Sequence, residues 1–203
     1  MWYKLKRILI YPDGVTEKQV RPSEYKYSYT FKWKTAAEIW NEWDLLVGSI
    51  GVNSEWLSQE CRIKKDISQI ADAKRIIITS NNVCYNTSSA TTIGIWTGTG
   101  WGNGGVYYNQ TGSNFSWIQA LIVYNGSEYK GSAVWYLSTW TYNPTVTIDL
   151  ENKTIVWELN WYNNSTVSLT DAQVSAIKQY PYLFVYTSQN NAAISDVSIT
   201  IEY

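Results

Sequence analysis

The stretch of sequence that decides the fold is Thr145-Val-Thr-Ile-Asp-Leu-Glu151, followed by the turn Asn152-Lys153 and by Thr154-Ile-Val-Trp-Glu-Leu-Asn-Trp161. In both halves apolar and polar residues alternate, and successive side chains of a strand point to opposite faces. The apolar face carries Val146, Ile148 and Leu150, and then Ile155, Trp157, Leu159 and Trp161. The stretch therefore predicts a β-hairpin with one face in a hydrophobic core.

Short β-rich runs of this kind recur from about residue 52 onward, with turn residues between them. Besides the hairpin, we expect strands at 61–65, 74–80, 91–97, 117–124, 133–139, 182–187 and 196–203. This spacing is typical of an all-β fold, a β-sandwich or jelly roll. A chain of 203 residues is long enough to bury such a core without disulfides or metals.

Two capping boxes predict two short helices. In Thr35-Ala-Ala-Glu38 and in Thr170-Asp-Ala-Gln173, a hydroxyl and a side chain three residues later can satisfy free amides at a helix start. Ile39, Trp43, Leu46 and Val47 continue the first helix at helical spacing to a stop at Gly48. The second helix is expected to end at Tyr180-Pro181.

A second alternating stretch, Tyr25-Lys-Tyr-Ser-Tyr-Thr-Phe-Lys-Trp-Lys34, lies near the N-terminus. On a strand its five rings share one face: Tyr25, Tyr27, Tyr29, Phe31 and Trp33. At roughly 150 to 250 Å² per ring, they exceed the apolar patch that soluble monomers expose. The strand is therefore either covered by its own domain or forms an oligomer or docking interface, and both alternatives stay open.

The N-terminal part of the chain is basic. Residues 1–34 hold eight Lys and Arg against three Asp and Glu, a net charge of +5, whereas the remainder holds eight against fourteen, a net charge of −6. We expect a small hairpin from strands at 2–11 and 15–21, closed by Pro12-Asp13-Gly14. Its basic charge favours an acidic docking surface. Nucleic acid is not expected, because the bases are thinly spread and no nucleic-acid-binding motif occurs.

The chain contains no histidine, which removes Ser-His-Asp and Cys-His catalysis and the common zinc sites. Asp149 and Glu151 share a strand face, and Glu158 lies on the partner strand, an arrangement compatible with a carboxylate pair of the glycosidase kind. Acids on a solvent face are normally solvating charges, and we therefore expect no enzyme. A glycosidase ranks third among the hypotheses.

Other chemical classes leave few signals. Cys61 and Cys84 match no zinc or redox spacing and are expected to be buried thiols. We expect no cofactor and no metal, since no calcium-loop motif is visible. The N-terminus lacks the apolar stretch of a secretory signal, and no 18-residue apolar run occurs, so no membrane insertion is expected.

A glycine-rich segment, Gly100-Trp-Gly-Asn-Gly-Gly105, matches a nucleotide-binding pattern, but β-type residues rather than a helix follow it. Trp101 then either folds back over the core or serves as a contact platform. With 12 Trp and 17 Tyr, the chain has many rings that could stack on sugars beside polar groups. The candidate glycan-binding residues are Trp101, Tyr107, Tyr108, Trp140 and Trp161.

The opening Tyr3-Lys-Leu-Lys-Arg7 and the later Glu17-Lys-Gln-Val-Arg-Pro22 resemble the N-terminal segment of virion fibre and decoration proteins of tailed bacteriophages, crAss-like phages among them. The resemblance implies a common docking site on the particle, with Lys4, Lys6, Arg7, Glu17, Lys18, Arg21 and Pro22 as attachment residues. The body, ending in Leu169–Lys178 and Ser195–Ile201, is similar to lectin-like jelly rolls of phage adhesins and of concanavalin-like carbohydrate-binding modules.

These observations combine into one hypothesis about organisation and function. We expect an attachment segment at 1–34, a helical connector at 35–50 and a jelly roll at 51–203. The resemblance implies a virion protein of the head or tail that contacts other capsid or tail proteins, forms a homotrimer and projects its body outward, where it meets host-surface glycans. The alternative is a freestanding carbohydrate-binding or lectin module.

Overall fold

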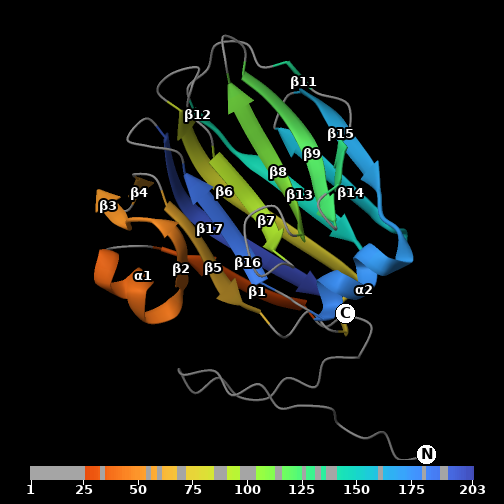
Figure 1. The fold of residues 1–203 in the computed structure, drawn as a ribbon, viewed down its shortest axis with the longest axis horizontal. Coiled ribbons are helices and arrows are strands. Elements are labelled where there is room, and N and C mark those ends of the chain that lie inside the picture. Colours follow the sequence, from red (N-terminus) through yellow and green to blue (C-terminus); the bar gives the residue numbers. More distant parts are fainter. Residues whose placement is uncertain are drawn as a thin grey trace, which may run out of the picture.

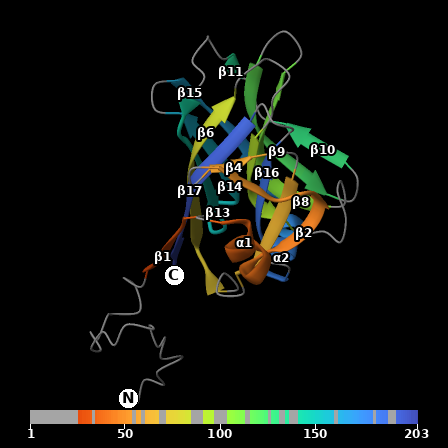
Figure 2. The ribbon, with the colours of Figure 1, turned by 90° about the vertical axis from the view of Figure 1, so that its left-hand side faces the viewer.

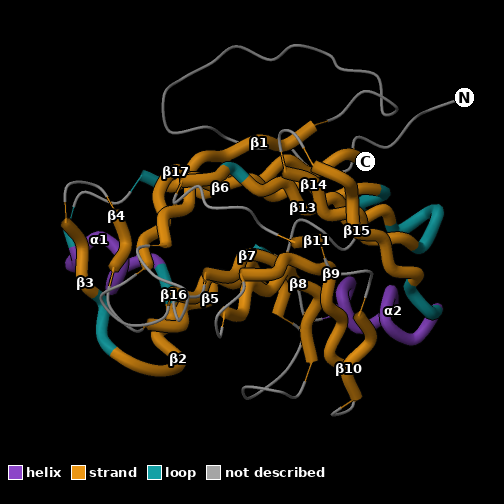
Figure 3. The backbone as a smooth tube through the Cα atoms, turned by 90° about the horizontal axis from the view of Figure 1, so that it is seen from above, coloured by secondary structure: helices purple, strands orange, loops and turns teal. Residues whose placement is uncertain are grey.

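The computed structural model describes residues 26–32, 35–53, 56–58, 61–67, 72–84, 91–96, 104–112, 116–124, 127–130, 134–135, 141–159, 162–179, 182–187 and 192–203. In this part the chain forms two antiparallel sheets stacked face to face (Figure 1, Figure 3). The predicted all-β sandwich is therefore confirmed.

The first layer, sheet A, has the strand order β15-β14-β13-β6-β17-β4-β3, with β1 also beside β17 and β12 beside β6. Its strands are β1 (Lys26–Phe31), β3 (Gly51–Asn53), β4 (Trp56–Ser58), β6 (Arg75–Cys84), β12 (Thr141–Tyr142), β13 (Pro144–Asp149), β14 (Thr154–Leu159), β15 (Tyr162–Ser168) and β17 (Ala192–Glu202). The predicted hairpin is present as β13 and β14, which pair from Pro144 opposite Leu159 to Asp149 opposite Thr154.

The second layer, sheet B, has the order β10-β9-β8-β7-β16-β5-β2, with β11 also beside β9. Its strands are β2 (Asp44–Gly48), β5 (Cys61–Asp66), β7 (Thr91–Trp96), β8 (Gly104–Gly112), β9 (Ser116–Tyr124), β10 (Ser127–Lys130), β11 (Val134–Trp135) and β16 (Tyr182–Thr187). Figure 3 shows β2 and β10, at the two edges of this sheet, bent away from sheet A, so the outer face of sheet B is concave.

The core lies between the two sheets and consists mainly of branched aliphatic residues. Sheet A contributes Ile76, Ile78, Val146, Ile148, Ile155, Trp157, Ile199 and Ile201, and sheet B contributes Ile63, Ile93, Ile95, Leu183 and Val185, all fully buried. These residues follow the alternation seen in the sequence. Because each such side chain contributes about 1.5 to 3 kcal/mol when it is removed from water, this layer holds the sandwich together.

Both capping boxes are present. Thr35 Oγ1 accepts a hydrogen bond from the amide of Glu38 at the start of α1 (Ala36–Glu42), and Glu38 accepts one from the amide of Thr35. Thr170 and Gln173 exchange the equivalent bonds at the start of α2 (Asp171–Gln179). Figure 3 shows the two helices at opposite edges of the sandwich.

The first helix is shorter than its sequence pattern predicts. It ends at Glu42, where Trp43 adopts an extended backbone, and the chain continues as β2. Leu45 there lies opposite Ile63 of β5, and Val47 lies opposite Arg62. The helical spacing of Leu46 and Val47 was therefore misleading, because pairing with β5 outweighs local propensity.

Other strand boundaries differ from expectation for similar reasons. The glycine-rich segment leads directly into β8, so Tyr107 and Tyr108 lie in the middle of a strand rather than beside a loop. The last strand begins at Ala192 and contains a bulge between Ser195 and Ser198, where Asp196 has a left-handed backbone with φ of 46°. A bulge breaks the strict alternation on which the prediction relied.

The aromatic strand near the N-terminus is part of sheet A as β1. It pairs with β17 over its whole length, from Lys26 opposite Glu202 to Phe31 opposite Val197, which brings its start beside the C-terminus (Figure 2). The segment 1–34 as a separate unit stays a prediction, and its last strand is shared with the sandwich. We call residues 1–25, which lie outside the described part, the leader.

Candidate functional site

The rings of β1 do not share one environment. Phe31 is buried in the core with its ring centroid 5.0 Å from that of Trp43, which follows α1. Tyr27 is partly buried against the same core, whereas Tyr29 is 45% exposed and meets Phe31 edge-on at 4.6 Å. Tyr25 and Trp33 lie outside the described residues. Phe31 thus serves the chain's own core, and Tyr29 is the ring of β1 that is open to a partner.

Most of the other predicted site residues lie outside the described part. This holds for the attachment residues Lys4, Lys6, Arg7, Glu17, Lys18, Arg21 and Pro22, and for the glycan candidates Trp101, Trp140 and Trp161. Tyr107 and Tyr108 are described through their backbone, opposite Gly94 and Ile93 of β7.

The described strands that flank the three tryptophans end at different ends of the sandwich. Trp101 is preceded by β7, which ends at Trp96, and Trp96 lies opposite Tyr182 at the start of β16. Trp140 precedes β12, whose Thr141 lies opposite Val83 near the end of β6. This end of β6 lies beside the start of β7, because Asn82 donates a hydrogen bond of 2.7 Å to Thr91. Trp161 follows β14, whose Leu159 is beside Pro144 at that same end.

Among the described side chains, a candidate binding site is formed on the concave outer face of sheet B. On β16, Leu183 and Val185 point into the core, whereas Tyr182, Phe184 and Tyr186 alternate with them and form a separate cluster with Leu46 of β2. Phe184 is fully buried at the centre of this cluster, and the two tyrosines are half-buried on either side of it. Two amphipathic rings therefore lie partly open on a fixed apolar base.

Two cations rest on these rings. Arg62 of β5 lies directly opposite Tyr186, with its guanidinium carbon 4.9 Å from the ring centroid. Lys64, two residues along the same strand, places Nζ 4.1 Å from the ring centroid of Tyr182. A cation over a ring face is attracted by the ring quadrupole and loses mobility. The contacts therefore hold two nitrogen donors in place at the surface.

Carboxylates complete the arrangement and balance its charge. Asp44 of β2 approaches Lys64 at 3.9 Å, and the exposed Asp66 lies opposite Tyr182 in the pairing of β5 with β16. The face thus presents two cations, two carboxylates and two phenol groups around a buried ring. Such a mixture of donors, acceptors and flat apolar surface suits a hydroxylated ligand.

Sequence reasoning did not single out these residues, although a signal was present. In Cys61-Arg-Ile-Lys64 and in Tyr182-Leu-Phe-Val-Tyr186, alternate residues are apolar and buried in the core, so the remaining ones must lie on the outer face. The alternation was hidden because both faces of β16 carry hydrophobic residues, aliphatic on the core face and aromatic on the outer face. The pairing of β5 with β16, more than one hundred residues apart, could not be read from the pattern.

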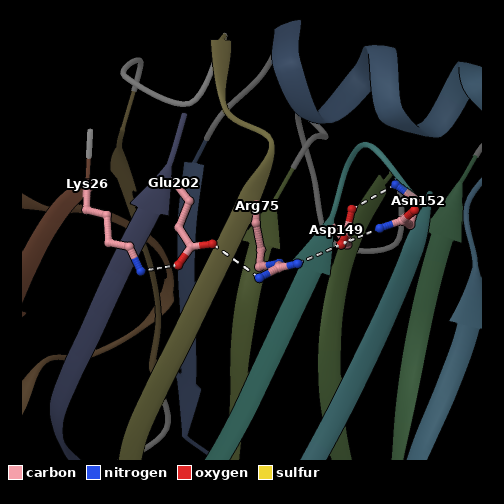
Figure 4. A network of polar contacts seen from close by, with 5 residues as sticks. All are labelled: Lys26, Arg75, Asp149, Asn152 and Glu202. Carbon is pink, nitrogen blue, oxygen red and sulfur yellow. Dashed lines mark hydrogen bonds and ion pairs between the residues drawn. The ribbon is translucent and has the colours of Figure 1, made fainter. Parts of the chain in front are cut away.

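The outer face of sheet A differs in composition, and its most ordered feature is a row of charges across four strands (Figure 4). Lys26 Nζ lies 2.6 Å from Glu202, and Arg75 bridges Glu202 at 3.2 Å and Asp149 at 3.3 Å. Asn152 donates to Asp149 from its amide at 2.7 Å and from Nδ2 at 3.0 Å, which closes the turn between β13 and β14. We call Lys26, Glu202, Arg75 and Asp149 the charged row.

The contacts of the charged row shift the ionisation of both carboxylates. The hydrogen bond from Lys26 lowers the pKa of Glu202 against the opposing effect of burial. Burial alone would raise the pKa of Asp149, but the hydrogen bonds from Asn152 and Arg75 outweigh it, so this pKa also lies below its ordinary value. Asp149 was expected on the solvent face, yet it is buried and held by three hydrogen bonds, which is the signature of a structural group.

Two rows of small uncharged residues lie beside the charged row on the same face. One row crosses the strands as Ser28, Thr200, Ile77 and Thr147, and the next as Thr30, Ser198, Thr79 and Thr145. All eight side chains are at least partly exposed. Ser28 and Thr200 are hydrogen-bonded at 3.1 Å, and Thr30 and Ser198 at 2.7 Å. Seven of these eight side chains carry a hydroxyl group, and the eighth is Ile77.

The candidate carboxylates Asp149 and Glu158 lie well apart on sheet A, and Cys61 is buried. Glu158 lies opposite Thr145, four ladder positions from Asp149, which is about 13 Å at the usual rise per residue and exceeds the separation of a glycosidase pair. Burial raises the pKa of Cys61 to about 11, against a smaller effect of its bond to Thr187, so this predicted buried thiol is unreactive at neutral pH. Cys84 is described through its backbone alone.

Neither of the described helices is long and apolar enough to cross a membrane. Among the described residues, no three acids or cysteines gather as a metal site would require.

Comparison with known proteins finds similarity in structure but not in sequence. No family model matches the sequence, and no curated protein matches it. The fold is similar to that of the CBM2 module of the evolved Dit of Lactobacillus casei BL23 phage J-1, at a TM-score of 0.57 and 8% identity over 91% of this chain and 93% of that chain. It is also similar to the carbohydrate-binding module CBM66 from Bacillus subtilis, at 0.53 and 10% over 77% and 94%.

A third structure, a protein of unknown function from Shewanella oneidensis MR-1, is similar at a TM-score of 0.59 and 10% identity over 91% of this chain and 90% of that chain. At identities this low the likeness concerns the fold. The described chain therefore has the β-sandwich architecture that also occurs in carbohydrate-binding modules, one of them in a phage protein.

Proposed function

We propose that the protein is a non-enzymatic structural component of a phage virion, whose leader docks on the particle and whose sandwich projects outward to bind host-surface glycans. The observation that carries the glycan part is the outer face of sheet B, where Arg62 and Lys64 rest on Tyr186 and Tyr182. Sugars offer hydroxyl groups to fixed donors and carboxylates, and an apolar ring face to aromatic side chains. The use of this fold in carbohydrate-binding modules supports the same proposal.

The virion part rests on the leader. Its basic sequence resembles the attachment segment of phage fibre and decoration proteins, and the similar fold of a module from phage Dit agrees with it. The strand that follows the leader, β1, starts at Lys26 opposite Glu202 in sheet A, the layer opposite the proposed glycan face. A place on the head or the tail of the particle and the association of three copies stay predictions.

Deletion of residues 2–22 tests the docking role. We expect the truncated protein to keep its melting temperature and its binding to glycans but to be absent from purified particles. The matched control is substitution of the exposed Glu151 by Ala, which leaves the leader and β1 intact. Normal incorporation of the truncated protein would reject the docking role while leaving glycan binding open.

A glycan array tests the binding role. We expect the full chain to bind a defined set of glycans, and the double variant Tyr182→Ala/Tyr186→Ala to lose at least tenfold in affinity while remaining folded. Substitution of Trp101 by Ala, on the same array, tests whether the predicted loop residue contributes. Strong glycan binding without any association with particles would favour the alternative, a freestanding carbohydrate-binding module. Cleavage of a bound glycan on long incubation would support the glycosidase instead.

A further inference from the structure

The charged row on sheet A alternates in sign across β1, β17, β6 and β13. Lys26, Glu202, Arg75 and Asp149 read plus, minus, plus, minus in strand order (Figure 4). A row of four alternating charges becomes its own complement when its direction is reversed. A half-turn about an axis parallel to the strands, between β17 and β6, reverses it in this way. Glu202 of one copy then faces Arg75 of a second copy, and Lys26 faces Asp149.

The same half-turn also matches the neighbouring rows. Next to the axis, Thr200 of one copy lies over Ile77 of the other, and Ser198 lies over Thr79. Farther from the axis, Ser28 and Thr30 of β1 lie over Thr147 and Thr145 of β13. Beyond them, Asp196 comes over Asn81, the side chain to which it is hydrogen-bonded within one copy at 2.8 Å. Among the described residues of these four strands, no two like charges meet.

Burial of this face would leave few polar groups without partners. The hydroxyl groups of β1 are already bonded to those of β17, and each charge of the row already has an opposite charge within 3.3 Å. The cost of burying hydroxyl groups and ions is high mainly when they lose their partners. Here the partners lie in the same copy and are kept on association.

We propose that the outer face of sheet A binds the same face of a second copy of this chain, in a two-fold sheet-to-sheet contact. The four strands cover roughly 19 Å by 23 Å at the usual strand spacing and rise, or about 450 Å² of each copy. That is below the area of stable complexes, so the dimer is weak and forms at high local concentration, such as on a particle. The contact is isologous and yields a dimer, whereas the predicted homotrimer requires a different surface. This inference does not rest on glycan binding.

Paired charge reversals test the proposal with the full-length chain. Arg75→Glu places two carboxylates face to face at the axis, and Glu202→Arg places two guanidinium groups there. We therefore expect each variant alone to sediment as a monomer at concentrations where the unaltered chain forms dimers. In an equimolar mixture every facing pair is again of opposite sign. The mixture should form a heterodimer with a dissociation constant at least tenfold lower than that of either variant alone.

A separate pair of variants tests the location without disturbing the ion pairs. Ile77→Arg adds a long charged side chain next to the axis and should abolish the dimer. Ser168→Arg, on the exposed outer face of β15 beyond the four strands, should leave it unchanged. The melting temperature of each variant reports whether it is folded. A monomer at all accessible concentrations, a trimer insensitive to Ile77→Arg, or folded charge variants that fail to associate on mixing would overturn the proposal.

Discussion

The outer faces of the two sheets are built on the same alternating pattern but serve different chemistry. On sheet B, aromatic side chains surround the buried Phe184 and carry Arg62 and Lys64 on their faces. On sheet A, small hydroxyl residues lie beside a row of mutually paired charges. The first face is concave and irregular and suits a small hydroxylated ligand, whereas the second is regular and suits another sheet. Under the two proposals made above, the sandwich separates ligand recognition from association by placing them on opposite layers.

The largest expected effect concerns the aromatic cluster of sheet B. Replacing Phe184, which is fully buried, by Ala should lower the free energy of unfolding by about 3 to 5 kcal/mol, because it leaves a cavity under the two tyrosines. Urea denaturation measures the loss. The matched change on sheet A, Ile77→Ala, removes a partly exposed side chain and should cost about 1 kcal/mol or less. Equal losses would mean that the two faces are buried alike.

The next effect concerns the charged row of sheet A. Asp149→Ala removes the acceptor for Asn152 and Arg75 and should destabilise the protein by about 2 to 3 kcal/mol at neutral pH. Glu151→Ala, an exposed acid in the same turn, is the control and should change stability by about 0.5 kcal/mol or less.

The pH dependence of stability follows from the same carboxylates. The pKa values of Asp149 and Glu202 are lower in the folded chain than the ordinary values of 3.8 and 4.5. Their contribution is therefore complete above these ordinary values and is lost as the pH falls through the lower folded ones. We expect the melting temperature to be steady from neutral pH down to about pH 5 and to fall below it. Asp149→Ala should flatten that fall, and an unchanged profile would contradict the assignment.

A smaller effect tests the cation–ring contacts of sheet B. A double-mutant cycle between Lys64→Gln and Tyr182→Leu should give a coupling of about 0.5 to 1 kcal/mol, because the ammonium lies 4.1 Å from the ring centroid and is mostly shielded. The exposed pair Lys153 and Asp171, 2.6 Å apart, should give less than about 0.5 kcal/mol in the same experiment. A coupling of zero for Lys64 and Tyr182 would mean that the ring does not hold the Lys64 ammonium in place, and the proposed site would then lack this fixed donor.

The smallest effect concerns Tyr29 on β1. Because this ring is 45% exposed and touches Phe31 only at its edge, Tyr29→Thr should cost about 0.5 kcal/mol in thermal unfolding. A loss of several times that size would show that the ring belongs to the core. The expectation that the β1 rings face a partner would then fail for Tyr29 as it does for Phe31.

The fold was predictable where burial and alternation coincide. Val146, Ile148, Ile155 and Trp157 are apolar at every second position and all are fully buried, so the hairpin β13–β14 followed directly from the sequence. The capping boxes at Thr35 and Thr170 likewise predicted both helix starts, because their hydrogen bonds are local.

Prediction failed where a distant strand decides the local structure. The residues after Trp43 continue a helical spacing, yet β5 recruits them as β2. The candidate site on sheet B depends on the pairing of Arg62 with Tyr186, which only the folded topology creates. The candidate tryptophans stand out in the sequence because turn residues surround them, whereas Tyr182 and Tyr186 lie inside an apolar strand and do not.

A binding titration most directly tests the separation of roles between the two faces. The glycan that binds most strongly on the array is titrated into the unaltered chain, into Tyr182→Ala/Tyr186→Ala on sheet B and into Ile77→Arg on sheet A. We predict that the sheet B variant loses at least tenfold in affinity and that the sheet A variant binds like the unaltered chain. Loss of binding in the sheet A variant, with the sheet B variant unaffected, would contradict the account.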